Sequence, residues 1–176
     1  MTQQVQVQHT LTFADFTRPS NTTAYTAADV IADSATAATT LTFSRASGEA
    51  GRGGSVKSAL IVCGANQATK LNADLFLFTA APATYGNDNE PFVPTDAEMN
   101  TLVGVVSLDG TTAANFKEGD ATGGAGGNAV IQSQGLDLPF QCAHTDAALY
   151  GVLVARNGYT PVSAETFRIK LGVQQG

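Results

Sequence analysis

The stretch Phe167-Arg-Ile-Lys-Leu-Gly-Val173 alternates apolar and other residues without a break. Successive side chains of a β-strand point to opposite faces of a sheet, so a period of two predicts a strand with one buried face. We expect the four apolar side chains of this stretch in the core. The intervening Arg168, Lys170 and Gly172 are expected on the outside.

The same period recurs near the beginning of the chain, from Val5 to Phe13. There we expect the core-facing set to be Val5, Val7, His9, Leu11 and Phe13, with Gln and Thr between them. Leu71 to Phe78 also alternates, with leucines and Ala73 on one face and two phenylalanines on the other. Val56 to Cys63 starts by alternating and becomes wholly apolar, which is typical of a central strand covered on both faces.

Other short apolar runs bounded by Gly, Pro, Asn and Asp bring the expected total to about nine strands. These further runs are Tyr25 to Ile31, Thr40 to Arg45, Leu102 to Leu108, Ala129 to Gln134 and Leu149 to Arg156. Many short strands with little helix predict an all-β fold, an antiparallel β-sandwich of jelly-roll type. We expect residues 13–176 to form one sandwich domain, and residues 1–12 to form an N-terminal arm or an edge strand.

One segment has the pattern of a helix start. In Thr95-Asp-Ala-Glu98, Thr95 is suited to the N-cap and Glu98 to the third helical position, and Pro94 precedes them. The expected helix is short, ending by Leu102, and at most one other short helix is expected in the chain.

The charge balance argues against nucleic acid as a partner. Fifteen Asp and Glu against nine Lys and Arg give a net charge of −6, and the cations are scattered along the chain. A nucleic-acid binder needs a basic surface to neutralise phosphates, so nucleic acid is not expected as a ligand.

No apolar run reaches the roughly 18 residues of a membrane span. The start, MTQQVQVQHT, lacks the pattern of a signal peptide, so we expect assembly in the cytoplasm of a cell.

The two cysteines, Cys63 and Cys142, lie inside apolar runs. Without a secretory context they are expected to be buried and unbridged, with a disulfide as the first alternative and metal ligation as the last.

No motif in the chain sets up catalysis or cofactor binding. The Gly-rich stretch from Gly119 to Gly127 lacks the Lys of a phosphate loop, and no Gly-x-Ser-x-Gly elbow is present. His144 and Asp146 are close in sequence, which is not the geometry of a triad. The oxygen-rich Gly86 to Glu90 is interpreted as a turn, with a calcium loop as the alternative. We therefore expect no catalytic, cofactor-binding or metal-binding residues.

Several short blocks, in one order, resemble structural proteins of tailed bacteriophages. They are Arg18-Pro19, Thr22-Thr-Ala-Tyr25, Asp29-Val-Ile31, Gly51-Arg-Gly-Gly54, Leu75-Phe-Leu-Phe78, Asp88-Asn89 with Phe92, Thr95-Asp-Ala-Glu98 and Gly104-Val-Val106. The resemblance covers roughly residues 13–108. It implies a non-enzymatic virion component without a cofactor. The type favoured here is a capsid decoration or cement protein that binds the major capsid protein on the head surface.

The resemblance leaves related roles open. These are a head-fibre, tail or baseplate component and, outside that class, a carbohydrate- or calcium-binding module or a hydrolase with paired carboxylates. A homotrimer is expected from the threefold points of shells, not from any residue. The arm and the resembling blocks supply the expected assembly contacts, Val5, Val7, Arg18, Tyr25, Asp88, Asn89 and Phe92. The loops from Thr84 to Pro94 and from Gly119 to Asn128 are expected to contribute too.

Overall fold

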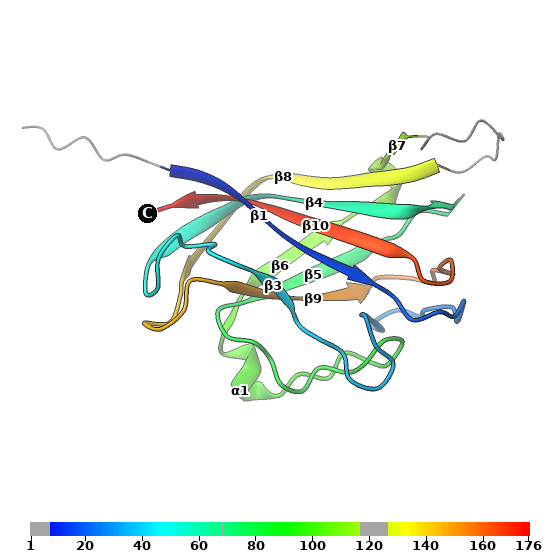
Figure 1. Cartoon of the computed structure of the whole chain (residues 1–176), viewed down its shortest axis with the longest axis horizontal. Coiled ribbons are helices and arrows are strands. Elements are labelled where there is room, and N and C mark those ends of the chain that lie inside the picture. The colour runs from blue at the N-terminus through cyan, green and yellow to red at the C-terminus, as the bar shows by residue number, and fades with distance from the viewer. Residues whose placement is uncertain (1–7, 68, 117–126) are drawn as a thin grey trace, which may run out of the picture.

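A computed structural model describes residues 8–67, 69–116 and 127–176, which form two antiparallel sheets packed face to face (Figure 1). The first sheet has the order β1 (Gln8–Thr17), β10 (Thr166–Gln175), β4 (Gly53–Gln67), β8 (Gly127–Gln141) and β7 (Ala114–Phe116). In the second sheet, β2 (Val30–Ile31) and β3 (Leu41–Phe43) both pair with β9 (Leu149–Ala155), followed by β5 (Ala73–Phe78) and β6 (Leu102–Leu108). The predicted all-β sandwich is confirmed.

The strand pairs are nested along the chain. β1 pairs with β10, β2 and β3 pair with β9, β4 pairs with β8, and β5 pairs with β6, all antiparallel. The pairs β10 with β4 and β9 with β5 then join these units into the two sheets. A long antiparallel hairpin whose two arms roll up together into two sheets gives this strand order. It is the strand order of a jelly roll.

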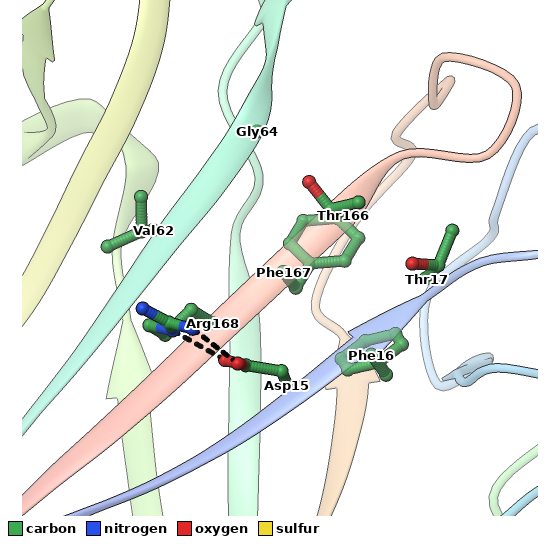
Figure 2. A pocket seen from close by; sticks show the side chains of 8 residues that line it. All are labelled: Asp15, Phe16, Thr17, Val62, Gly64, Thr166, Phe167 and Arg168. Atoms are coloured by element: carbon green, nitrogen blue, oxygen red, sulfur yellow. Dashed lines mark hydrogen bonds and ion pairs between the residues drawn. The ribbon is translucent and has the colours of Figure 1, made fainter.

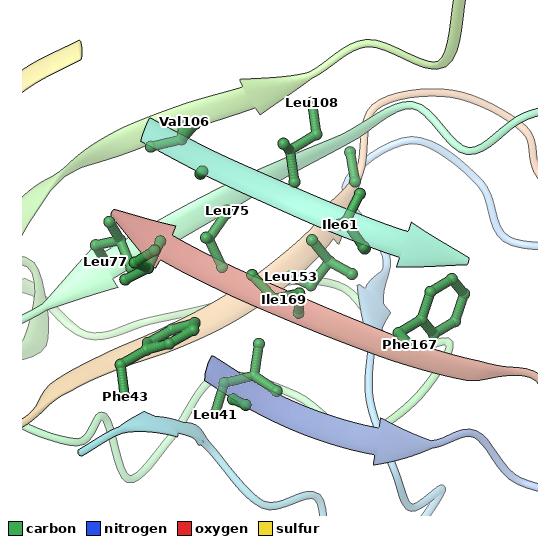
Figure 3. Packing of buried hydrophobic residues seen from close by; sticks show 14 of the residues in the cluster. Leu41, Phe43, Ile61, Leu75, Leu77, Val106, Leu108, Leu153, Phe167 and Ile169 are labelled. Atoms are coloured by element: carbon green, nitrogen blue, oxygen red, sulfur yellow. The ribbon is translucent and has the colours of Figure 1, made fainter. Parts of the chain in front are cut away.

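The main core lies between the two sheets (Figure 3). The predicted inward face of β10 is confirmed, because Phe167, Ile169, Leu171 and Val173 are all buried. The leucine face of Leu71 to Phe78 is confirmed as well, since Leu71, Ala73, Leu75 and Leu77 are all buried.

A second apolar cluster covers the outer face of the second sheet. Phe78, Val152 and Val154 of that face pack with Tyr85, and the ring of Phe92 lies 4.6 Å from that of Phe76. Tyr85 and Phe92 belong to the long connection between β5 and β6, which lies beneath the second sheet in Figure 1. The outer face of the first sheet has no such cover among the described residues, and Leu60 and Val62 of β4 are half-buried there. The prediction that Val56 to Cys63 is covered on both faces is therefore wrong for its outer face.

The predicted facing of the first strand is also wrong. In β1, Leu11 is 72% exposed and Phe13 56%, whereas Thr12 and Ala14 are buried. The inward positions of β1 lie against β3, where small side chains fit and the Thr12 hydroxyl donates to the Ser44 carbonyl (2.9 Å). His9 is exposed too, and Val5 and Val7 lie outside the described residues.

Residues 8–12 are continuous with the rest of β1, which is an edge strand. Of the two alternatives for residues 1–12, the described part has the structure of the edge strand. The division expected at residue 12 falls inside β1.

Local signals predicted the existence of elements better than their lengths. The helix α1 (Asp96–Met99) has the capping box expected from Thr95 and Glu98, but it is a single turn. A 3-10 turn (Gly110–Thr112) is the other helical element of the described residues. The strand expected at Ala129 to Gln134 extends over the whole of β8, and β7 was not predicted.

Both cysteines are buried and unbridged in the structure. Burial raises the pKa of the Cys63 thiol to about 12 and also raises the pKa of Cys142. Because the thiolate is the reactive form, a thiol reagent should react slowly with the folded protein and count two thiols after denaturation. If no thiols are found after denaturation without reductant, the two cysteines are disulfide-bonded and this prediction is wrong.

Candidate functional site

A buried ion pair joins two segments that are seventy residues apart in the chain. Arg18 follows β1 directly, and Asp88 lies in the connection between β5 and β6. Arg18 Nη2 lies 3.1 Å from Asp88 Oδ2, and both side chains are almost fully buried. A buried charge is costly unless it is paired and hydrogen-bonded, so each of these groups needs the other in the folded state.

Tyr25 closes the pair into a triangle. Its hydroxyl accepts a hydrogen bond from Arg18 Nε and donates one to Asp88 Oδ1 (2.5 Å). Burial, together with the Asp88 carboxylate, raises the pKa of the Tyr25 phenol, so the phenol stays protonated and can donate. The Asp88 carboxylate also accepts from the backbone N–H of Ala32 (3.0 Å). We call Arg18, Tyr25 and Asp88 the Arg18 cluster.

A second group of polar side chains continues from the Arg18 cluster. The ring of Tyr159 stacks on that of Tyr25 at 6.4 Å, and the Tyr159 hydroxyl donates to the Glu165 carboxylate (2.8 Å). Gln67 Nε2 donates to both Tyr159 Oη and Glu165 Oε2. Burial raises the pKa values of Tyr159 and Glu165. The backbone N–H of Arg18 donates to the Glu165 carbonyl (2.9 Å), which links the two groups.

This arrangement is suited to holding loops rather than to chemistry. The polar atoms of the Arg18 cluster bind one another, nearby backbone groups or the Asn21 side chain. Their side chains are buried, so a substrate cannot reach them. The cluster fixes the segment after β1, the connection between β5 and β6, and the turn before β10 at one end of the sandwich.

The structure places the predicted assembly residues in three settings. Arg18, Tyr25 and Asp88 are brought together but are buried, so their side chains lack the surface that a direct contact with a partner requires. Asn89 has a positive φ of 63° in a turn, as its residue type allows, and its N–H donates to the Val30 carbonyl. Phe92 is half-buried in the second apolar cluster. Any role of these five in assembly would act through the loops that they hold.

Sequence reasoning missed the other half of the network, Tyr159, Glu165 and Gln67. No spacing signal connects Glu165 with Tyr159, because they lie on either side of an ordinary turn. The bridge between Tyr25 and Tyr159 brings these residues to the Arg18 cluster, and that bridge is a tertiary pairing.

A hollow of about 470 Å³ lies on the outer side of the first sheet (Figure 2). Its lining includes Gly64, Thr17, Thr166 and the Asp15–Arg168 ion pair. Arg168 donates to both carboxylate oxygens of Asp15 at 2.6 and 2.5 Å and holds the pKa of Asp15 below its ordinary value. The carboxylate is therefore engaged in the ion pair, and its low pKa makes it a poor general base.

The other candidate polar groups are engaged in turns. Glu90 accepts from the N–H and the side-chain amide of Asn87, and Asp146 accepts from the Tyr150 hydroxyl rather than pairing with His144. Among residues 8–67, 69–116 and 127–176, no three His, Cys, Asp or Glu side chains group as metal ligands. In the same ranges, no helix has the length and apolar character needed to cross a membrane.

Comparisons with known proteins add no assignment to this geometry. No protein-family model matches the chain, and no curated protein sequence matches it significantly.

Proposed function

We propose that this protein is a non-enzymatic virion component of a tailed bacteriophage, a capsid decoration or cement protein that binds the major capsid protein on the outer head surface. The observation that carries the proposal is the convergence, in space, of blocks that resemble such proteins in sequence. Arg18, Tyr25 and Asp88 come from three of these blocks and form one buried cluster.

Backbone hydrogen bonds extend this convergence. The Val30 N–H donates to the Glu90 carbonyl (2.8 Å), and the Phe92 N–H donates to the Ala28 carbonyl (2.8 Å). Residues 28–31 and 88–92 thus form one unit although they are far apart in the chain. Blocks that hold one another in place would be expected to occur together and in a fixed order, which supports the proposal.

The fold and the composition agree with a protein that works through its surfaces. Jelly rolls occur in viral capsid domains and also in lectins, so the fold by itself does not decide between these functions. Charged residues are only 14% of the chain, against about 25% in ordinary soluble domains. The net charge of −6 suits the outside of a shell, away from the packaged nucleic acid.

The outer face of the first sheet is the proposed shell-binding surface. The strand register places Phe13, Lys170, Leu60 and Gln132 side by side in one row across four strands. The next row holds Asp15, Arg168, Val62 and Val130. Half-buried or exposed apolar side chains thus lie among a few charges, on a face that no other described segment covers. Such a mixed surface of apolar and charged side chains is typical of protein interfaces.

The proposal predicts that purified protein binds phage heads lacking it and raises the temperature at which the shell ruptures. Many copies bound to a symmetric shell gain affinity through avidity, even when each single contact is weak. Leu60→Glu should weaken binding at least tenfold, because it places a carboxylate in the proposed contact. Val105→Glu, at an exposed position of the second sheet, should bind like the wild type. The measurements are co-sedimentation with heads and a thermal rupture assay.

If the wild-type protein neither binds heads nor shifts rupture, the cement role fails and a head-fibre, tail or baseplate role moves ahead. An inventory of purified virions by mass spectrometry, with copy numbers, separates these roles. The homotrimer, expected from shell symmetry alone, concerns copies seated on the shell, and the arrangement of copies on decorated heads tests it.

A further inference from the structure

The strand β1 has a free edge whose hydrogen-bonding groups can be assigned. β1 lies at the end of the first sheet and, among the described strands, pairs only with β10, in a register without a shift. Just beyond the ladder, the Arg18 N–H donates to the Glu165 carbonyl, which continues the same register. Because hydrogen-bonded positions alternate in an antiparallel pair, even-numbered residues of β1 point their N–H and C=O groups toward β10. His9, Leu11, Phe13, Asp15 and Thr17 point theirs away from it.

These outward backbone groups have no partner in the described part of the chain. Natural edge strands are commonly protected by proline, lysine, a bulge or a covering segment. Residues 8–17 contain no proline or lysine, and their register with β10 has no bulge. Leu11 and Phe13, two of the most exposed large apolar side chains, lie on this strand. An open edge flanked by exposed apolar side chains is suited to pairing with another strand.

We propose that a second copy of this chain occupies the edge, with β1 paired antiparallel to β1 about a two-fold axis at Thr12. This register sets Leu11 of each copy opposite Phe13 of the other, and His9 opposite Asp15. In this register the odd residues of one copy face odd residues of the other, so the free N–H and C=O groups meet. An axis at Phe13 would instead set Leu11 against the Asp15 carboxylate. An axis at Leu11 would separate the two apolar side chains, because Phe13 would face His9.

The surface beside β1 has room for a second copy of the chain. A hollow of about 650 Å³ borders Gln8, Thr10 and Leu11, and its opposite wall carries Arg45 and the ion pair of Arg52 with Glu49. In the proposed register, residues 13–16 of the second copy pair with residues 8–11 of the first. This hollow leaves room beside the free edge for the incoming segment, and Asp15 of each copy keeps its ion pair with Arg168 on the outer face. The pairing joins the first sheets of both copies into one continuous sheet. It shares Phe13 and Asp15 with the proposed shell-binding surface but is tested without phage particles.

The test is the mass of the purified chain, measured without phage particles by light scattering over a hundredfold range of concentration. The wild type should have twice the 18.1 kDa of one chain. Leu11→Pro removes an N–H that faces the free edge and leaves the ladder with β10 intact, so it should weaken dimerisation at least tenfold. Leu11→Lys should do the same by placing a charge at the edge. Val93→Lys, an equally drastic change at another exposed apolar position, should leave the dimer unchanged.

Circular dichroism of each variant shows whether the sandwich is retained, so loss of the dimer is not confused with unfolding. A wild-type protein that stays monomeric at the highest concentration would overturn the proposal. So would a trimer, or a dimer that survives in folded Leu11→Pro and Leu11→Lys variants. Because no particle is present, these outcomes are distinct from failure of the cement role.

Discussion

Replacement of Asp88 by alanine is expected to lower the free energy of unfolding by about 3–5 kcal/mol, because it leaves the Arg18 guanidinium buried without its counter-charge. The Tyr25 hydroxyl and the Ala32 N–H lose an acceptor at the same time. For a chain of this size the loss corresponds to a fall in Tm of about 6–20 °C. Urea unfolding followed by circular dichroism measures it.

The matched control is Asp15→Ala, which breaks another Arg–Asp pair but at the surface. Exposed pairs contribute at most about 1 kcal/mol, so this variant should differ little from the wild type. Replacing Arg18 and Asp88 together with apolar residues should cost less than Asp88→Ala alone, since no buried charge is then unpaired. Equal, small effects of Asp88→Ala and Asp15→Ala would show that the Arg18 cluster does not hold the loops.

A second large effect is expected in the core, where Ile61→Ala should cost about 2–5 kcal/mol. Ile61 is fully buried between the sheets, and truncation removes apolar contacts and leaves a cavity (Figure 3). Leu60, its neighbour on β4, faces the outside of the first sheet and is half-buried. Leu60→Ala should therefore cost about 1 kcal/mol or less.

The comparison uses adjacent residues of similar size on one strand, so it tests the facing of the strand directly. Denaturant unfolding of both variants measures the difference. If Leu60→Ala were the more destabilising of the two, the assignment of the inner face of β4 would be wrong.

The sequence by itself determined the elements whose signals are local. The unbroken alternation from Phe167 to Val173 predicted both a strand and its buried face, because its outward positions hold Arg, Lys and Gly. The capping box at Thr95 predicted the start of α1, because its hydrogen bonds lie within four residues. Many such strands with little helix were enough for the all-β sandwich.

Only the tertiary structure decided which face of β1 is buried. A period of two says that the two faces of a strand differ, but it does not say which one meets the core. In β1 the larger apolar side chains, Leu11 and Phe13, lie outside. Pairing with β10 and packing against β3 place the small side chains of Thr12 and Ala14 in the interior. These partners come from distant parts of the chain, so no window of sequence contains the information.

The Arg18 cluster was decided in the same way. The blocks that contain Arg18, Tyr25 and Asp88 were recognisable in the sequence, but their burial and their contacts were not. Arg18 and Asp88 are charged residues of a kind that is usually exposed, and each can be buried only because the other is brought to it. That encounter depends on the nested strand pairing of the whole jelly roll, which is a property of the fold and not of any segment.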